Sequence, residues 1–154
     1  MASSAAAVSS AARVFAPALP SIAVLPFRNM SAEKDAEYFS DGITEEIISA
    51  LTGISQMRVA ARTSSFAFKG KDTDVRQIGR ELGVRTVLEG SVRQSGRRLR
   101  ITAQLIDVGS GYQLWSERFD REMEDVFAVQ DEITRAIAST LHVRLVGSGA
   151  VRVR

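Results

Sequence analysis

Apolar and polar positions follow distinct patterns along this chain, and each pattern predicts a different element. Residues 21–27, SIAVLPF, form a short apolar run closed by Pro26, which is typical of a buried strand. From residue 37 to residue 54 apolar side chains recur every three or four positions, which predicts an amphipathic helix. The apolar residues of that helix are Phe39, Ile43, Ile47, Leu51 and Ile54. Residues 57–62, MRVAAR, predict a second short strand.

The next segment contains a predicted loop followed by a short helix. Residues 63–72, TSSFAFKGKD, are expected to form a loop that two phenylalanines anchor to the domain. Residues 73–83, TDVRQIGRELG, predict a helix with Thr73 or Asp74 as its N-cap. Gly83 is expected to end this helix, because glycine readily adopts the left-handed conformation of a C-terminal cap.

Beyond residue 83 apolar residues recur at every second position, as in a strand, and no longer at the spacing of a helix. Residues 84–94, 97–107 and 111–120 predict three strands joined by tight turns, which make an antiparallel meander. Residues 124–145 again show a helical period and predict a last helix. The predicted order is β-α-β-α-β-β-β-α. Right-handed crossovers through the first two helices would make the first three strands parallel, and the hairpins would then reverse only the fourth.

These patterns together predict which side chains form the core. The residues expected to be buried are Ile22, Val24, Leu25, Ile43, Ile47, Leu51, Val87, Leu88, Ile101, Leu105, Ile133 and Ile137.

The register of the meander decides where its only tryptophan points. A Ser95–Gly96 turn would pair Arg93 with Arg98 and place both on a polar face that also carries Arg100. If Asp107 and Tyr112 closed the second turn, Trp115 and Phe119 would join the arginines on that face, a composition that interfaces favour. A three-residue loop at 109–111 would instead turn Trp115 inward beside Leu105, because a one-residue slip exchanges the two faces of a strand.

The overall charge is small, but the charges are unevenly distributed. The 154 residues are 45% hydrophobic and 25% charged, with a formal net charge of +2, which is a globular composition. Residues 58–100 hold eleven Lys and Arg against four Asp and Glu, whereas residues 1–57 and 101–140 are acidic. Self-complementary contacts or a single basic face would both fit this distribution. The chain contains no cysteine and one histidine, which excludes disulfides and a histidine-based metal site.

The two ends of the chain are expected to lie outside the folded domain. Residues 1–20 are rich in Ala and Ser and are interpreted as a flexible leader, and residues 146–154 as a C-terminal tail. The leader lacks the basic start and the apolar run of a secretory signal, and no segment is long enough to span a bilayer. Direct membrane insertion is therefore not expected.

Three carboxylates near Gly42 are the first candidates for acid–base chemistry. Successive helical residues are about 100° apart, so Asp41 and Glu45 would lie on the outer face, with Glu46 toward the flank. Neither burial nor a charged partner is evident there, and a general acid needs one or the other to shift its pKa. We interpret these carboxylates as the solvated side of a helix.

No other motif supports catalysis, a metal or a cofactor. The sequence KGKD at 69–72 has Asp72 where a phosphate-binding loop needs Ser or Thr. Ser64 and Ser65 lack the G-x-S-x-G context of a nucleophile. His142 is better explained as a partner for a helix C-terminus. We therefore predict that this chain has no catalytic residues and is not an enzyme.

One cluster could contact an anionic ligand. The predicted loop and its flanks bring cations and aromatic residues close to strand ends, where open α/β sheets bind ligands. The residues of this lip are Arg62, Phe66, Phe68, Lys69 and Lys71. Plain packing of the two phenylalanines is the alternative.

The chain from Ser21 to about Leu145 resembles the TolB-like amino-terminal domain of large bacterial regulatory proteins. The matching segments are SIAVLPF, EYFSDGITEEII, ARTSSFAFKGKDTDVRQIGRELGV, VLEGSVRQSGRRLRITAQLID, GYQLWSERFDRE and DVFAVQDEI. The resemblance implies a three-layer α/β/α fold like that of anticodon-binding domains. Its mixed five-stranded sheet has the order 2-1-3-4-5, with strand 4 antiparallel.

The resemblance also suggests a function. In that family the domain lies between a signalling module (a nucleotide cyclase, a kinase or a winged-helix regulator) and tetratricopeptide repeats. We therefore expect a non-catalytic binding or regulatory module that contacts a protein or a small ligand, with self-association left open. Relatives with a membrane span suggest an extracytoplasmic location. The alternative is nucleic-acid binding through the basic segment 58–100. The arginines that cluster at one hairpin, Arg93, Arg97, Arg98 and Arg100, would contact phosphates, and Trp115 would stack on bases.

Overall fold

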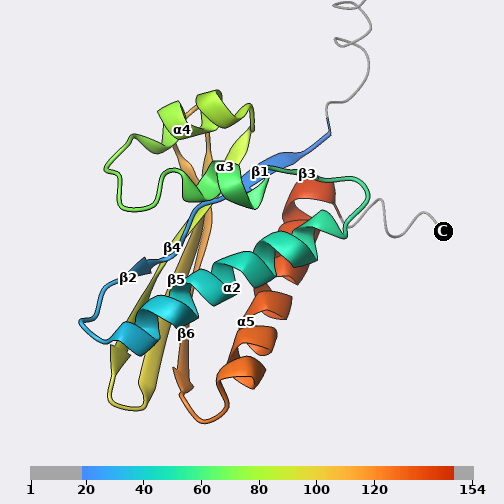
Figure 1. Cartoon of the computed structure of the whole chain (residues 1–154). Coiled ribbons are helices and arrows are strands. Elements are labelled where there is room, and N and C mark those ends of the chain that lie inside the picture. Colours follow the sequence, from blue (N-terminus) through green and yellow to red (C-terminus); the bar gives the residue numbers. More distant parts are fainter. Residues whose placement is uncertain (1–18, 148–154) are drawn as a thin grey trace, which may run out of the picture.

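The computed structural model describes residues 19–147, so the expected leader 1–20 lies almost entirely, and the expected tail 146–154 mostly, outside the described residues. Strands and helices alternate in the first half of the chain, and three long strands and a helix follow (Figure 1). The elements are β1 (Ser21–Val24), β2 (Arg28–Asn29), α2 (Lys34–Thr52), β3 (Arg58–Val59), α3 (Arg62–Phe66), α4 (Val75–Leu82), β4 (Thr86–Ser95), β5 (Arg98–Asp107), β6 (Gln113–Glu122), α5 (Val126–Leu141) and the π-helical turn η1 (His142–Val146).

The sheet has the order β3-β1-β4-β5-β6, which confirms the predicted order 2-1-3-4-5. β1 pairs in parallel with β3 and β4, and β5 is antiparallel to both of its neighbours. The predicted first strand, 21–27, is interrupted. β1 ends at Val24, and β2 resumes the pairing with β4 at Arg28, which adds a sixth strand. Between them the amide of Phe27 donates to the hydroxyl of Thr44 on α2 rather than to a strand.

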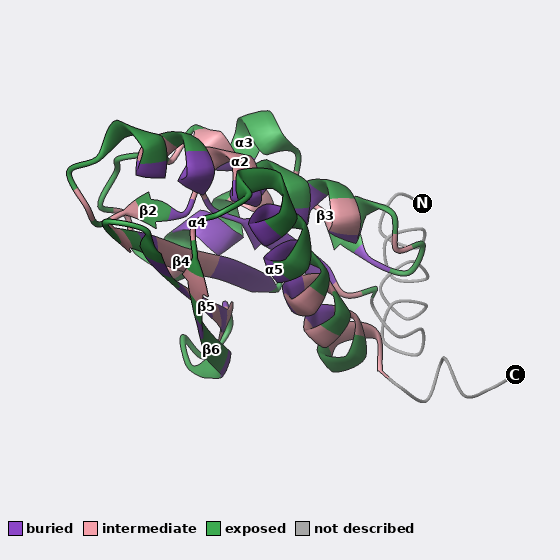
Figure 2. Ribbon diagram, turned by 90° about the horizontal axis from the view of Figure 1, so that it is seen from below, coloured by how far each residue is buried: buried purple, intermediate pink, exposed green. Residues whose placement is uncertain are grey.

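α2 and α5 cover one face of the sheet. α2 buries Phe39, Ile43, Ile47 and Leu51 of its predicted stripe, whereas Ile54 lies beyond the helix and is half-buried. α5 buries its predicted stripe from Val129 onward, but Val126 at its start is 40% exposed. The exposed residues of both helices lie mainly on the outer sides (Figure 2). The two helices come close at Gly42, where an added Cβ would lie 2.5 Å from the Nε2 atom of Gln130. Asp125 caps α5 by accepting hydrogen bonds from the amides of Phe127 and Ala128, which fixes where this helix begins.

α4 covers part of the opposite face. Asp74 accepts a hydrogen bond from the amide of Arg76 at its start, and Gly83 ends it with a φ of 70°, as expected. A second and smaller core lies beneath this helix, formed by Ala23, Leu25, Ile78, Val84, Val87 and Val108. The α/β/α layering is thus confirmed, although β6 contributes no residue to this second core.

All twelve residues predicted for the core are buried. Most of them belong to the larger core between the sheet and the α2–α5 layer, whereas Leu25 and Val87 belong to the smaller one.

The predicted loop at 63–72 is wrong in its first half, because α3 occupies Arg62–Phe66. This helix has only five residues, too few for an apolar period to show in the sequence. The strand predicted over 57–62 is likewise shortened to Arg58–Val59.

The first hairpin of the meander is shifted by two residues from the predicted register. Arg93 pairs with Arg100 rather than Arg98, and Ser95 pairs with Arg98, so Gly96 and Arg97 form the turn. A shift of two keeps every side chain on its face. The polar face predicted for β4 and β5 is therefore correct despite the wrong pairs.

The second hairpin contains a β-bulge that the sequence did not reveal. The amide of Asp107 donates to the carbonyl of Tyr112, so these residues close the turn. A register shift then follows between Leu105 and Ile106, and beyond it Leu105 pairs with Trp115. One extra residue on β6 turns the rest of this strand over, because alternate side chains of a strand point to opposite faces.

Candidate functional site

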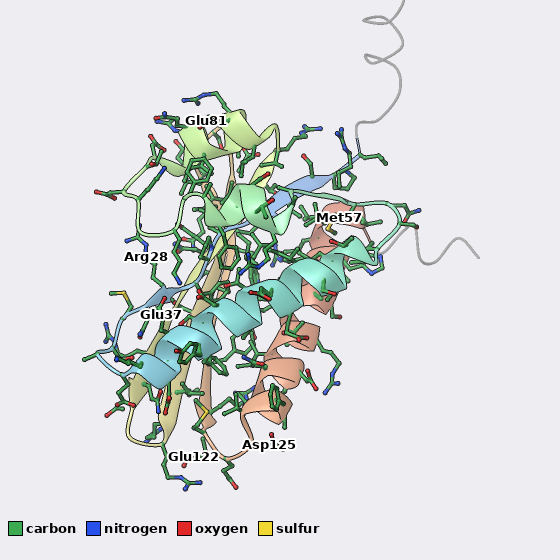
Figure 3. The ribbon with its side chains drawn as sticks, in the orientation of Figure 1. Arg28, Glu37, Met57, Glu81, Glu122 and Asp125 are labelled. Carbon is green, nitrogen blue, oxygen red and sulfur yellow. The ribbon has the colours of Figure 1, made fainter. Side chains whose placement is uncertain are left out.

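A cavity of about 820 Å³ lies at the carboxyl end of β1, between the segment 68–73, the β1–β2 connection and the polar face of β4 and β5. Phe68, Lys69 and Lys71 from the predicted lip are among its lining residues. Figure 3 shows Arg28 and Glu37, two further lining residues, at this edge of the molecule. The structure therefore brings part of the predicted lip to the end of a central strand, where open α/β sheets bind ligands.

Lys69 is held by two carboxylates of α2. Its Nζ atom lies 2.6 Å from an oxygen of Glu37 and 2.6 Å from an oxygen of Asp41. The hydrogen bonds to Asp41 and Glu37 raise the pKa of Lys69, and the bond from Lys69 lowers the pKa of Glu37. We call Lys69, Glu37 and Asp41 the lysine clasp. It fastens the rim of the cavity to α2, and both carboxylates favour the protonated form of Lys69.

The clasp corrects the expectation that the outer face of α2 lacks charged partners. Asp41 binds Lys69, and Glu45 binds Arg62 with a nitrogen–oxygen distance of 2.8 Å. Both partners come from the segment that follows β3, which folds back over α2. This contact joins residues far apart in the sequence, so the helical period of α2 could not reveal it.

Arg62 and the two phenylalanines attach the segment 62–68 to the domain. The guanidinium of Arg62 lies 4.1 Å from the centre of the Phe66 ring, in a cation–π arrangement. Phe66 packs against the larger core and Phe68 against the smaller one, so the two rings dock as predicted. Arg62 and Phe66 do not line the cavity.

The floor of the cavity is polar and already hydrogen-bonded. The amide of Gln104 donates to Glu89 at 2.8 Å, and the hydroxyls of Ser91 and Thr102 lie 2.6 Å apart. These residues are on β4 and β5, on the part of the sheet face that α4 leaves uncovered. Glu89 and Gln104 are not among the site residues predicted from the sequence.

The arginines of the meander lie farther along the same uncovered face. Arg93, Arg98 and Arg100 are exposed, and Arg100 binds Asp120 of β6 at 2.9 Å. The hydrogen bond from Arg100 and the charges of Arg100, Arg118 and Arg98 lower the pKa of Asp120. Several arginines thus surround one carboxylate on an open strand surface.

Trp115 and Phe119 lie on the opposite face, contrary to the interface register. Trp115 is 9% exposed and Phe119 4%, and both belong to the larger core. The bulge beside Leu105 is the reason, because it turns both side chains toward α5. The alternative that placed Trp115 beside Leu105 is the correct one.

A second hollow of about 460 Å³ lies between the amino-terminal parts of α2 and α5. Tyr38 and Phe127 line it, and each is 76% exposed. Sequence analysis overlooked both residues because each adjoins the apolar stripe of its helix without belonging to it. Their adjacency to Phe39 and Val126 was the only available signal.

No group of three or more His, Cys, Asp or Glu residues within 19–147 is arranged to hold a metal ion. In the same part of the chain, no helix is both long and apolar enough to cross a membrane.

Comparisons with known sequences place this domain in larger proteins. A family model described as "HilA/YgeH-like transcriptional regulator, second domain" matches residues 18–136. The chain is also 60% identical over 129 residues to "Putative adenylate cyclase 3" of Rhizobium meliloti (strain 1021). The match covers 84% of this chain but only 22% of that protein, so the chain spans about a fifth of its relative's length.

Comparisons with solved structures support the TolB-like resemblance at the level of the fold. The C-terminal domain of LpoB from Salmonella enterica aligns with a TM-score of 0.56 and 16% identity, over 75% of this chain and 91% of that one. TolB from Acinetobacter baumannii aligns with a TM-score of 0.53 and 16% identity, over 81% of this chain and 29% of that one. The chain has a TolB-like fold and, by its sequence, belongs to the family of the second domain of HilA/YgeH-like transcriptional regulators.

Proposed function

We propose that this chain is a non-catalytic regulatory module that acts by binding a protein partner or a small ligand. The observation that carries the proposal is that one domain occurs in two kinds of protein with different described activities, a transcriptional regulator and an adenylate cyclase. When two proteins with different activities share a domain, that domain is best explained by a task common to both, such as receiving a signal or contacting a partner.

The geometry of the cavity at the end of β1 supports a binding role. The cavity is within the range of small-molecule sites, and its charged rim is held in place by the lysine clasp. Lys71 also lines the cavity and makes no ion pair within the described residues, which leaves it available to an anionic group. We place ligand contact at Phe68, Lys69 and Lys71, with Arg62 and Phe66 supporting the rim.

Two measurements, one on the purified chain and one in the native host, test this proposal. Incubation with ATP, GTP and p-nitrophenyl acetate should give no turnover above that of heat-denatured protein, and robust turnover would refute the non-catalytic role. A photo-crosslinking residue placed in turn at Lys71, Arg93 and Phe127 should then yield at least one discrete protein or ligand adduct in the native host. Absence of any adduct would contradict the binding role.

Nucleic-acid binding is the second candidate. Arg93, Arg98, Arg100 and Arg118 share one uncovered sheet face, as a phosphate-contacting surface requires. Trp115 cannot stack on bases as the sequence suggested, because its side chain lies in the core. If this chain binds nucleic acid, its affinity for a single-stranded oligonucleotide should fall steeply between 50 and 200 mM salt, by about 10²-fold or more for six or more phosphate contacts.

The extracytoplasmic location implied by the family resemblance is likewise a proposal. Alkaline phosphatase fused to the end of the full gene product would be active only if this domain is exported, which separates the two compartments.

A further inference from the structure

The hollow between α2 and α5 is an apolar groove with large side chains open to solvent. We call it the helix groove, and its lining includes Asp35, Tyr38, Glu46, Met123, Val126 and Phe127. Tyr38 and Phe127 are each 76% exposed, and Val126 is 40% exposed. Large aromatic side chains without a partner on a protein surface are typical of contact sites, because aromatic residues are enriched at interfaces.

The charges around the helix groove have one sign. Asp35, Glu45 and Glu46 line it, and no Lys or Arg does. Glu45 is paired with Arg62, but Asp35 and Glu46 make no ion pair within the described residues. β4 supplies Gln94 to the lining, and the adjoining turn at Gly96 and Arg97 supplies no lining residue. The carbonyl of Arg97 nevertheless accepts a hydrogen bond from the amide of Met123. An occupant that brings cations would therefore meet unpaired carboxylates.

The surrounding elements determine what kind of segment can enter. α2 and α5 bond their own backbone groups, so the groove offers no strand edge to which an extended peptide could add. A helix satisfies its own backbone and can present an apolar stripe to such a groove. The groove's Met123 and Phe127 suit one or two bulky apolar side chains.

This chain is a poor candidate for the occupant. On its arginine-rich face, on β4–β6, Trp115 and Phe119 point into the core, and the exposed Leu114 lies at the opposite end of β6 from the partners of Arg98 and Arg100. A second copy could thus supply the charge but not the apolar side chain from the same surface.

We propose that the helix groove binds an amphipathic, basic helix of a partner protein. Its apolar face would lie on Tyr38 and Phe127, and its Lys or Arg residues would face Asp35 and Glu46. This inference rests on the proposed binding function and names the surface and the chemistry of the partner.

The test uses the full 154-residue chain and a synthetic fluorescent helix of about four turns, roughly 14 residues, with leucines on one face and lysines on the others. A second peptide carries glutamate in place of every lysine. The lysine peptide should bind at least about tenfold more tightly than the glutamate peptide, measured by fluorescence anisotropy at physiological salt. Equal affinity for the two peptides would overturn the proposal.

Variants locate the binding surface. The double variant Tyr38→Ala/Phe127→Ala should weaken binding of the lysine peptide about tenfold or more, because buried aromatic anchors carry much of an interface's energy. Tyr112→Ala is the matched control, since Tyr112 is also 76% exposed but lies outside the helix groove. Glu46→Lys should weaken binding, whereas Glu81→Lys on α4 should not. An equal loss of affinity in Tyr112→Ala, or no loss of affinity in the double variant, would show that the peptide does not bind in the helix groove.

Three further outcomes separate this inference from the proposed function. If the free chain self-associates and Phe127→Ala abolishes the association, a second copy occupies the helix groove and the inference fails. If crosslinking in the host yields a partner adduct at Lys71 or Arg93 but not at Phe127, the binding function stands and the inference fails. If no position yields an adduct, the proposed function itself fails.

Discussion

Gly90 lies where the ring of Phe27 crosses β4. A Cβ added at this position would lie 2.5 Å from that ring and would also meet the carbonyl oxygen of Thr102 on β5. The ring can cross here only because residue 90 has no side chain. The break between β1 and β2, which brings Phe27 inward, therefore depends on a glycine in another strand.

We predict that Gly90→Ala destabilises the domain by about 1–3 kcal/mol, as overpacking of a well-filled core does. The free energy of unfolding can be measured by urea titration followed by circular dichroism. Gly53→Ala is the control, because the nearest atom to its added Cβ is 3.5 Å away and its φ is −72°. A similar loss for both variants would show that helix and strand propensity, rather than contact with Phe27, sets the effect.

The lysine clasp predicts a dependence of stability on pH. The lowered pKa of Glu37 contributes stability above its ordinary value of 4.5, and this is lost as pH falls through the lowered folded value. The raised pKa of Lys69 contributes stability below its ordinary value of 10.5, and this is lost as pH rises through the raised folded value. The clasp should thus act between about pH 5 and pH 10.

Lys69→Met should therefore lower the free energy of unfolding at pH 7 by less than about 1 kcal/mol, since the paired groups are partly exposed. The difference from the unmodified chain should shrink as the pH falls from 5 toward 2. Lys71→Met should show neither effect. A difference that persists unchanged at low pH would mean that Lys69 stabilises through packing of its chain alone.

At the scale of elements, the bulge in the second hairpin has the largest consequence. One extra residue in β6, opposite the junction of Leu105 and Ile106, decides which face Trp115 and Phe119 occupy. Turning them inward places both side chains in the larger core, which α5 covers, and removes them from the outer surface of the meander. The bulge thus removes an aromatic surface that the sequence pattern allowed.

We predict that the fluorescence of Trp115, the only tryptophan of the chain, is blue-shifted and resists acrylamide in the folded protein. Emission should shift to the red on unfolding in urea. A red-shifted, readily quenched emission from the folded chain would contradict the inward register.

At the scale of the whole molecule, the two faces of the sheet differ in how well they are covered. α2 and α5 enclose a core of more than twenty buried residues, whereas α4 and the β1–β4 half of the sheet enclose a core of six. A helix of eight residues over a small core should open more readily than the larger layer, because local stability follows the buried contacts.

Two substitutions should show this difference by hydrogen–deuterium exchange. Leu51→Ala, in the larger core, should cost about 2–5 kcal/mol and lower protection across the sheet and both long helices. Ile78→Ala, in the smaller core, should lower protection mainly in residues 75–82. Uniform loss of protection in both variants would show that the two cores unfold as one unit.

The sequence alone determined the order of the main elements along the chain and the identity of the core. Hydrophobic period, caps such as Asp74 and stops such as Gly83 are local properties, so they can be read without knowing what lies nearby. Crossover handedness then limited the topology, and the family resemblance supplied the strand order.

Only the tertiary structure decided how the candidate site is assembled. Whether Lys69 is free or clasped depends on carboxylates of α2 more than 25 residues away in the sequence. Whether Trp115 points in or out depends on one bulge, which a period of two cannot specify because either face fits the pattern. The helix groove likewise exists because α2 and α5 start side by side, which brings Tyr38 and Phe127 together from distant parts of the chain.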